Sequence, residues 1–145
     1  MKILLFQIGK EIFGMELKSI VRIVFCAELE HGFEGELSDN TQVINWQKNL
    51  IPVINLQQML QEGTRTEVKR IFIILSFNNR LRAVPVDNAE EICDVAYDRI
   101  MPVPKTILDR KENRILNGIA VLKDKMIPLI DHSVLFKVAV TDPLF

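Results

Sequence analysis

The chain has 145 residues, a formal net charge of −1 and a hydrophobic fraction of 48%, which suits one domain or two mutually dependent ones. Its Lys and Arg residues are scattered, so no basic surface attracts nucleic acid or anionic lipid. No apolar run has the length of a membrane span or of a signal-peptide core, and we expect a cytoplasmic protein without direct membrane insertion or nucleic-acid binding.

The first half predicts short strands separated by turns. In chain order, the expected strands cover residues 3–8, 12–17, 18–25, 42–46 and 50–54. The acidic stretch 27–40 predicts a loop, and 56–60 predicts one helical turn. Pro52 has no amide hydrogen to donate, so its strand must lie at a sheet edge or carry a bulge.

The second half repeats this order. Its expected strands cover residues 70–77, 80–86, 92–95, 116–122 and 125–130. A proline-led, charged loop is expected at 101–113, a short helix at 132–137 and a frayed end to the tail 137–145. Many short strands with frequent turns indicate an all-β barrel or sandwich.

The two halves are related by an internal repeat. Residues 46–55 match 122–131 at an offset of 76 positions, and residues 3–17 match 72–86 at an offset of 69. We therefore expect one domain of two subdomains, at about 1–66 and 67–136. A lone half would be too small to be stable by itself, which indicates that the halves share a core.

No residue pattern in the sequence indicates catalysis, and we expect neither an enzyme, a cofactor nor a metal site. Asp131 and His132 are adjacent, but neighbours on a strand point to opposite faces. His31 lies in an acidic loop and reads as a solvated surface residue. Cys26 and Cys93 lack metal-ligand spacing, and without a secretory signal we expect free, reduced thiols.

Trp46 is the only tryptophan and stands at the start of the repeated segment. A partly exposed tryptophan would be a binding anchor. Its counterpart in the repeat is Leu122, an ordinary core residue, so we favour burial.

The residue order identifies a resemblance to a known family. The pattern F-x-x-G-x-x-x-F-G-M-E-L-x-x-I-V-x-I runs from Phe6 to Ile23, and V-I-N-x-x-x-x-L-I-P-V-I-N-L runs from Val43 to Leu56. In the second half, A-V-P-V-D-N-A-E-E-I and G-I-A-V-L-K-D-K-M-I-P-L-I-D continue the match. Together they resemble the CheW-like domain of bacterial chemotaxis coupling proteins over nearly the whole chain.

This resemblance implies two SH3-like, five-stranded β-barrels that share a hydrophobic interior. It also implies an adaptor without catalytic activity. Its partners would be the regulatory domain of a CheA-type histidine kinase, which has the same fold, and the cytoplasmic tip of a chemoreceptor.

The chain departs from the family pattern at its first repeated hairpin, which reads G-V-x-N-L-R-G-x-V-x-P-V-x-D-L in the family. The family's residues are replaced here by Gln42, Trp46, Gln47, Lys48 and Asn55. Gln47 stands where the family has an arginine on its kinase- and receptor-facing surface, so bidentate pairing is lost there. The acidic segment 28–39 replaces the family's proline-rich loop.

Two further positions bear on binding. Ile20 keeps the apolar character of a family valine, and Arg22 replaces a common glutamate. The expected partner-binding residues are Ile20, Arg22, Asn45, Trp46, Gln47 and Lys48. Plain core packing would explain Ile20 equally well, and a solvated hairpin tip would explain Gln47 and Lys48.

Two other functions remain open at this level. The altered Gln47 motif would also suit an accessory scaffold of a motility or pilus system that no longer couples to receptors. A small barrel that binds a ligand or nucleic acid is a third reading, which the even charge and the single Trp and Tyr oppose.

Overall fold

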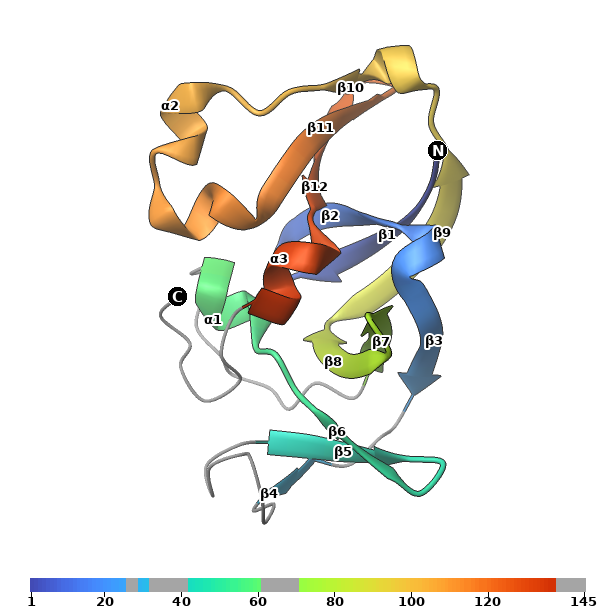
Figure 1. Cartoon of the computed structure of the whole chain (residues 1–145). Coiled ribbons are helices and arrows are strands. Elements are labelled where there is room, and N and C mark those ends of the chain that lie inside the picture. Colours follow the sequence, from blue (N-terminus) through green and yellow to red (C-terminus); the bar gives the residue numbers. More distant parts are fainter. Residues whose placement is uncertain (26–28, 32–41, 61–70, 138–145) are drawn as a thin grey trace.

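The computed structural model describes residues 1–25, 29–31, 42–60 and 71–137, and the chain in these ranges is built almost entirely of strands (Figure 1). The strands are β1 (Lys2–Ile8), β2 (Glu11–Glu16), β3 (Ile20–Phe25), β4 (Leu29–His31), β5 (Gln42–Trp46), β6 (Asn49–Pro52), β7 (Ile71–Phe77), β8 (Arg80–Val86), β9 (Asn88–Asp94), β10 (Ile100–Met101), β11 (Leu116–Leu122) and β12 (Lys125–Ile130). The helices are α1 (Leu56–Leu60), α2 (Lys105–Leu108) and α3 (His132–Lys137), with 3-10 turns η1 (Leu17–Ser19), η2 (Tyr97–Arg99) and η3 (Lys111–Ile115). None of the helices in these ranges is long and apolar enough to cross a membrane.

The strands form two barrels. The second barrel is a six-stranded sheet in the order β10-β11-β12-β2-β1-β9. The first barrel combines two three-stranded sheets, β3-β7-β8 and β4-β5-β6. A parallel bridge between Val53 and Ala83 joins these two sheets, and the Ile54 amide donates to the Ala83 carbonyl at 2.8 Å. The predicted all-β, SH3-like architecture is confirmed, although the sheets contain more strands than the five expected for each barrel.

The strands of the two halves are exchanged between the barrels. β1 and β2, from the first half, pair with β9 and β12 from the second half. β3, again from the first half, pairs with β7. The predicted division at about 1–66 and 67–136 thus marks the sequence repeat, whereas the sheets cross that boundary.

The two halves exchange strands in the same way, so that contacts in one barrel have equivalents in the other, at the repeat offsets of 76 and 69 positions. In the second barrel the parallel pair β12–β2 places Leu129 opposite Gly14. In the first barrel, Val53 lies opposite Ala83. Val53 precedes Leu129 by 76 positions and Gly14 precedes Ala83 by 69, so the same contact is made twice, each time between residues of different halves.

Side-chain alternation along β1 and β7 explains the shared interior. On β1, Ile3 and Leu5 fill the second barrel, and Leu4 and Phe6 point into a layer between the barrels. On β7, Phe72 and Ile74 fill the first barrel, while Ile73 and Leu75 enter the same layer. Because successive residues of a strand face opposite sides, each of these strands serves two cores at once. The predicted shared hydrophobic interior is therefore present.

The repeated Asn55 and Asp131 are helix caps. The Gln58 amide donates to Asn55 Oδ1 at 3.0 Å, before α1, and the Ser133 amide donates to Asp131 Oδ1 at 3.0 Å, before α3. Asn and Asp cap helices about equally well. Asn55 in place of the family's aspartate therefore keeps the local structure. From the sequence, Asp131 and His132 are expected to be neighbours on one strand. This expectation is wrong, because β12 ends at Ile130 and Asp131 follows it.

Two predicted boundaries were wrong. The sequence predicts separate strands at 80–86 and 92–95, whereas the second of these begins four residues earlier, as β9 over Asn88–Asp94. β9 is the outer strand of its sheet, and most of its side chains are exposed. Its sequence is therefore polar at positions where a buried strand would be apolar. The predicted loop at 101–113 contains α2 and part of η3.

Candidate functional site

β3 is an edge strand, and it carries the first two predicted binding residues. Among the described strands it pairs with β7 alone. Its register shifts between Ile20 and Arg22, so that Val21 is an extra, bulged residue. Ile20 is half-buried against the shared interior, and Arg22 is exposed. A bulge on an edge strand discourages further strand pairing, so this surface presents side chains rather than a free backbone edge.

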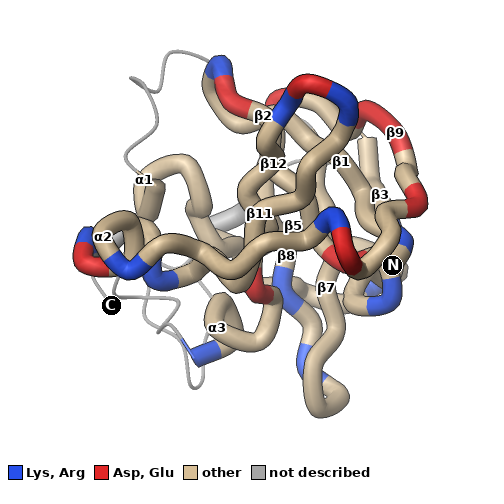
Figure 2. The backbone as a smooth tube through the Cα atoms, turned by 90° about the horizontal axis from the view of Figure 1, so that it is seen from above, with Lys and Arg blue, Asp and Glu red and all other residues tan. Residues whose placement is uncertain are grey.

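β9 is the pseudo-symmetric counterpart of β3 and carries the opposite charge. Its register against β1 shifts at the equivalent place, with Glu91 opposite Leu5 as Arg22 is opposite Ile74. Figure 2 shows acidic residues along β9. Arg22 and Glu91 therefore occupy matching positions with opposite sign, which makes each the natural control for the other.

The β5–β6 hairpin carries the remaining predicted residues. Asn45 is exposed, and Trp46 is half-buried against the core of the first barrel, so its predicted burial is partial. The exposed turn residues Gln47 and Lys48 have φ values of 50° and 66°. Both values lie in the left-handed region, where residues other than glycine carry a cost of about 1 kcal/mol or more. Lys48 adopts this conformation where the family pattern has glycine.

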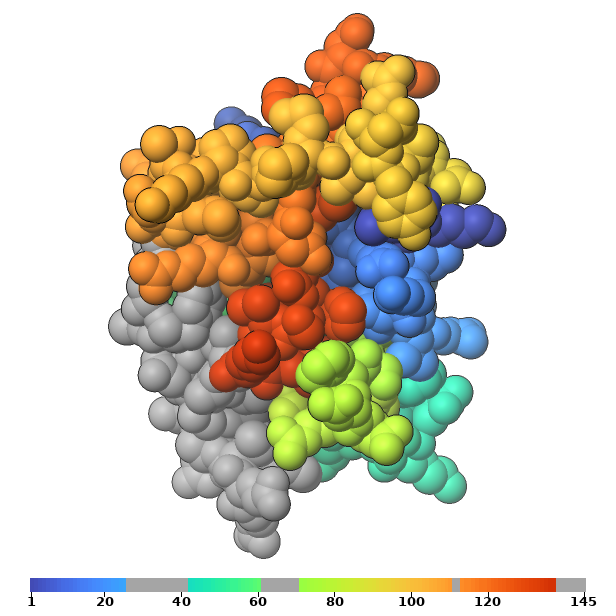
Figure 3. Space-filling view, turned by 45° about the horizontal axis from the view of Figure 1, so that its top comes forward, coloured from blue at the N-terminus to red at the C-terminus, as the bar shows by residue number. Residues whose placement is uncertain are grey.

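β3 and the hairpin tip lie on the same side of the first barrel, as Figures 1 and 3 show. Val24 of β3 and Trp46 pack against the same core, which fixes the two elements relative to each other. Exposed apolar side chains accompany them, and sequence reasoning missed these: Val21, Phe25 and Leu50. Phe25 is 62% exposed. No pattern in the strand sequence could reveal this, because exposure depends on which neighbouring strand is absent.

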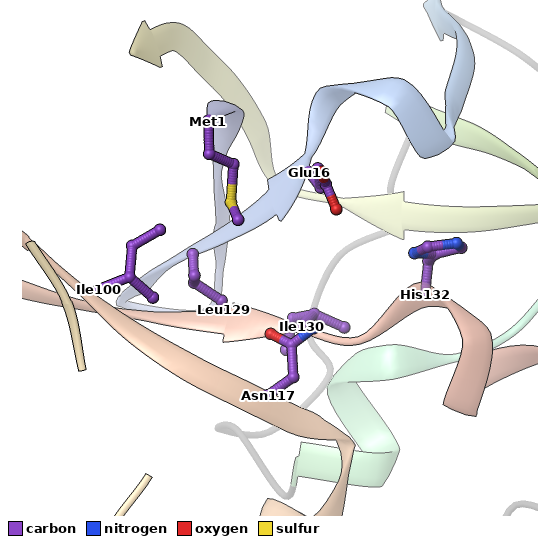
Figure 4. Close-up of a pocket in the computed structure, with 7 residues that line it drawn as sticks. All are labelled: Met1, Glu16, Ile100, Asn117, Leu129, Ile130 and His132. Atoms are coloured by element: carbon purple, nitrogen blue, oxygen red, sulfur yellow. The ribbon is translucent and has the colours of Figure 1, made fainter. Parts of the chain in front are cut away.

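A cleft of about 110 Å³ opens at the second barrel, between residues of β2, β10, β11, β12 and the start of α3 (Figure 4). Sequence reasoning also missed this cleft. It is lined by Met1, Glu16, Ile100, Asn117, Leu129, Ile130 and His132. Figure 4 shows Glu16 and His132 projecting toward the same space, while Met1, Ile100 and Leu129 form an apolar end. The Glu16 carboxylate already pairs with Lys18 at 3.2 Å.

Comparison with known proteins identifies the family. The model of the CheW-like domain matches residues 2–140. The chain belongs to the CheW-like domain family. The chemotaxis protein CheW of Klebsiella aerogenes is 22% identical over 135 residues, which cover 88% of this chain and 76% of that protein. The crystal structure of the scaffolding protein TtCheW from Thermoanaerobacter tengcongensis matches with a TM-score of 0.76 and 25% identity, over 96% of this chain and 94% of that one.

Within the described ranges, no group of three or more His, Cys, Asp and Glu residues could hold a metal ion. Asp131 accepts hydrogen bonds from the Ser133 amide and hydroxyl, and His132 packs edge-on against Phe77. The adjacent acid and imidazole thus have separate structural roles. His31 has no described side chain, and Cys26 lies outside the described residues.

Cys93 of this CheW-like chain is a free thiol, and we expect it to be a poor nucleophile. Burial raises its pKa, the Glu91 carboxylate raises it further, and Lys123 opposes both. A raised pKa leaves less thiolate at any given pH, and the thiolate is the reactive form. In a Cys26→Ser background, alkylation by iodoacetamide should be slower than that of glutathione, and Glu91→Gln should accelerate it. Equal rates for Cys93 and glutathione would contradict the expectation.

Proposed function

We propose that this protein is a chemotaxis scaffold that couples chemoreceptors to a CheA-type histidine kinase through binding alone. The observation that carries the proposal is the match of nearly the whole chain, residues 2–140 in sequence and 96% of the chain in fold, to the CheW-like family and a CheW structure. Receptor conformations would then bias the kinase through their relative affinities for the scaffold.

The binding surface that we propose joins β3 to the β5–β6 hairpin. It contains the residues expected from sequence, Ile20, Arg22, Asn45, Trp46, Gln47 and Lys48, with the exposed apolar Val21, Phe25 and Leu50 around them. Apolar side chains around a few polar groups are typical of a protein-binding surface. Ile20 and Trp46 support this surface from below, because both are half-buried in the barrel cores.

The test is a calorimetric titration against the regulatory domain of the CheA-type kinase encoded in the same genome. We expect micromolar or tighter binding by the native protein, about −8 kcal/mol. Arg22→Ala should weaken binding at least tenfold, because the guanidinium's contact with the partner would be lost. Glu91→Ala, at the equivalent position of β9, should leave the affinity unchanged.

Gln47→Arg restores the family's planar, charged fork and is included in the same series. A large gain in affinity from this variant would show that the surface has drifted from the family's. If neither the native protein nor Gln47→Arg binds the kinase domain, the coupling function is wrong. A parallel pull-down with the cytoplasmic fragment of a chemoreceptor tests the second partner.

A further inference from the structure

A cationic corner lies where α3 packs on the end of the β7–β8 hairpin. We define it by Phe77, Arg80, Arg82, His132 and Phe136. The ring of Phe77 lies 5.7 Å from that of His132 and 5.6 Å from that of Phe136. Arg82 Cζ lies 5.5 Å from the centre of the Phe136 ring. Figure 3 shows α3 and the hairpin side by side on an open face.

Arg80 and Arg82 of this corner have no acidic partner among the residues that the structure describes. They are two residues apart on β8, so their side chains leave the same face of the strand. Within the described ranges neither takes part in an ion pair, and the ion pairs found there are those of the N-terminus with Asp94 and of Lys18 with Glu16. Figure 2 shows the basic residues of β8.

Arg82 is also incompletely hydrogen-bonded. Its Nη1 donates to the Leu81 carbonyl at 2.7 Å, and its buried Nε has no hydrogen-bond partner. Burial, and then the nearby Arg80, lower the pKa of Arg82 below its usual value. A half-buried cation beside a like charge is unfavourable unless an anion compensates it.

Packing does not require this arrangement, as the other half of the repeat shows. At the offset of 69, Arg82 corresponds to Phe13 and Phe77 to Ile8. Phe13 is buried and stacks on Phe6 at 6.2 Å, in the same interior layer. An apolar side chain therefore closes the equivalent end of the core. In the first barrel the equivalent residue is Arg82. Its guanidinium is a poorer packing group than a phenyl ring but can bind an anion.

We propose that the cationic corner is a docking site for an acidic segment of a partner protein, with a carboxylate on the arginines and an adjacent apolar side chain on the aromatic rings. A planar carboxylate matches the fork of a guanidinium in two parallel hydrogen bonds. The half-buried rings of Phe77 and Phe136 offer apolar contact beside the charge. This charge complementarity favours a peptide over a simple phosphate ion, which would leave the rings unused. The site lies on β8, across β7 from β3, and its test needs neither proposed partner.

The experiment is an NMR titration of the full chain with the end-blocked tripeptide Glu-Phe-Glu, and with Gln-Phe-Gln as the uncharged match. We expect saturable shifts of the Arg82 side-chain resonances and the His132 ring with Glu-Phe-Glu, at an affinity in the millimolar range suited to so short a ligand. Gln-Phe-Gln should give none. Inorganic phosphate, as a third probe, should give weaker shifts confined to the arginines.

Two variants separate recognition from folding. Arg82→Phe introduces the residue found at the equivalent position of the other half, so the chain should fold with an unchanged or raised unfolding midpoint while the peptide shifts disappear. Arg82→Lys keeps the charge but loses the planar fork, and should weaken binding at least fivefold. The proposal is overturned if Glu-Phe-Glu gives no saturable shift, if Arg82→Phe binds it unchanged, or if phosphate binds as tightly as the peptide.

Discussion

Replacing Phe6 by alanine is expected to lower the free energy of unfolding by about 3–5 kcal/mol, the range for large-to-small changes of buried aromatic residues. Phe6 is fully buried on β1 and stacks on Phe13 in the layer between the barrels. A loss of this size is a large share of the 5–15 kcal/mol that stabilises a typical domain.

The same variant tests whether the barrels unfold together. Phe6 belongs to a strand of the second barrel, whereas Trp46 packs in the core of the first. Urea unfolding of Phe6→Ala, followed by Trp46 fluorescence and by far-UV circular dichroism, should give coincident transitions displaced by the same amount. Tyr97→Ala is the matched control, because Tyr97 is 73% exposed and its loss should change stability by no more than about 0.5 kcal/mol. Two separated transitions would show that the barrels are independent.

Introducing valine at Gly14 should cost about 1–3 kcal/mol, since overpacking of a well-filled core is itself destabilising. A Cβ at Gly14 would lie 2.9 Å from Leu129 Cδ2 and 3.3 Å from Ile3 Cδ1. Both side chains are buried in the second barrel. Urea unfolding measures the loss.

The equivalent contact in the first barrel suggests a second-site variant that should restore stability and a matched control variant. The first barrel tolerates Ala83 at the equivalent position because it faces Val53, which is smaller than Leu129. Gly14→Ala should therefore be destabilising alone and should recover in part when combined with Leu129→Val. Ala83→Gly removes one methyl group and should cost about 1 kcal/mol. If Gly14→Val unfolds at the native urea concentration, the close approach of β2 and β12 is not a constraint.

The sequence reveals the hairpins and the shared interior, because both depend on local patterns. The apolar composition of residues 3–8 and the apolar repeat at 46–55 and 122–131 are enough to predict them. Strand exchange could not be predicted. A repeat shows which residues are equivalent, but β3 could pair with its own half or with β7 without any change in its sequence.

The candidate site likewise has residues that the local sequence predicts and residues whose surroundings it does not predict. Gln47 and Lys48 are placed at a hairpin tip by the turn alone, as predicted. The exposure of Phe25 and the setting of Arg82 depend on packing between elements distant in the chain. Residues 80–82 read R-L-R, an ordinary alternating strand, until α3 lays the Phe136 ring beside Arg82.

The exchanged strands have a mechanical consequence. Within the described chain, the backbone passes between the barrels twice, through η1 from β2 to β3 and through Asp87 from β8 to β9. Two bodies tethered at two points can swing only about the axis through both tethers. Any such swing would pull apart the buried layer that contains Phe6 and Leu75. Among the described residues, the two tethers and the buried layer therefore oppose a hinge motion between the barrels.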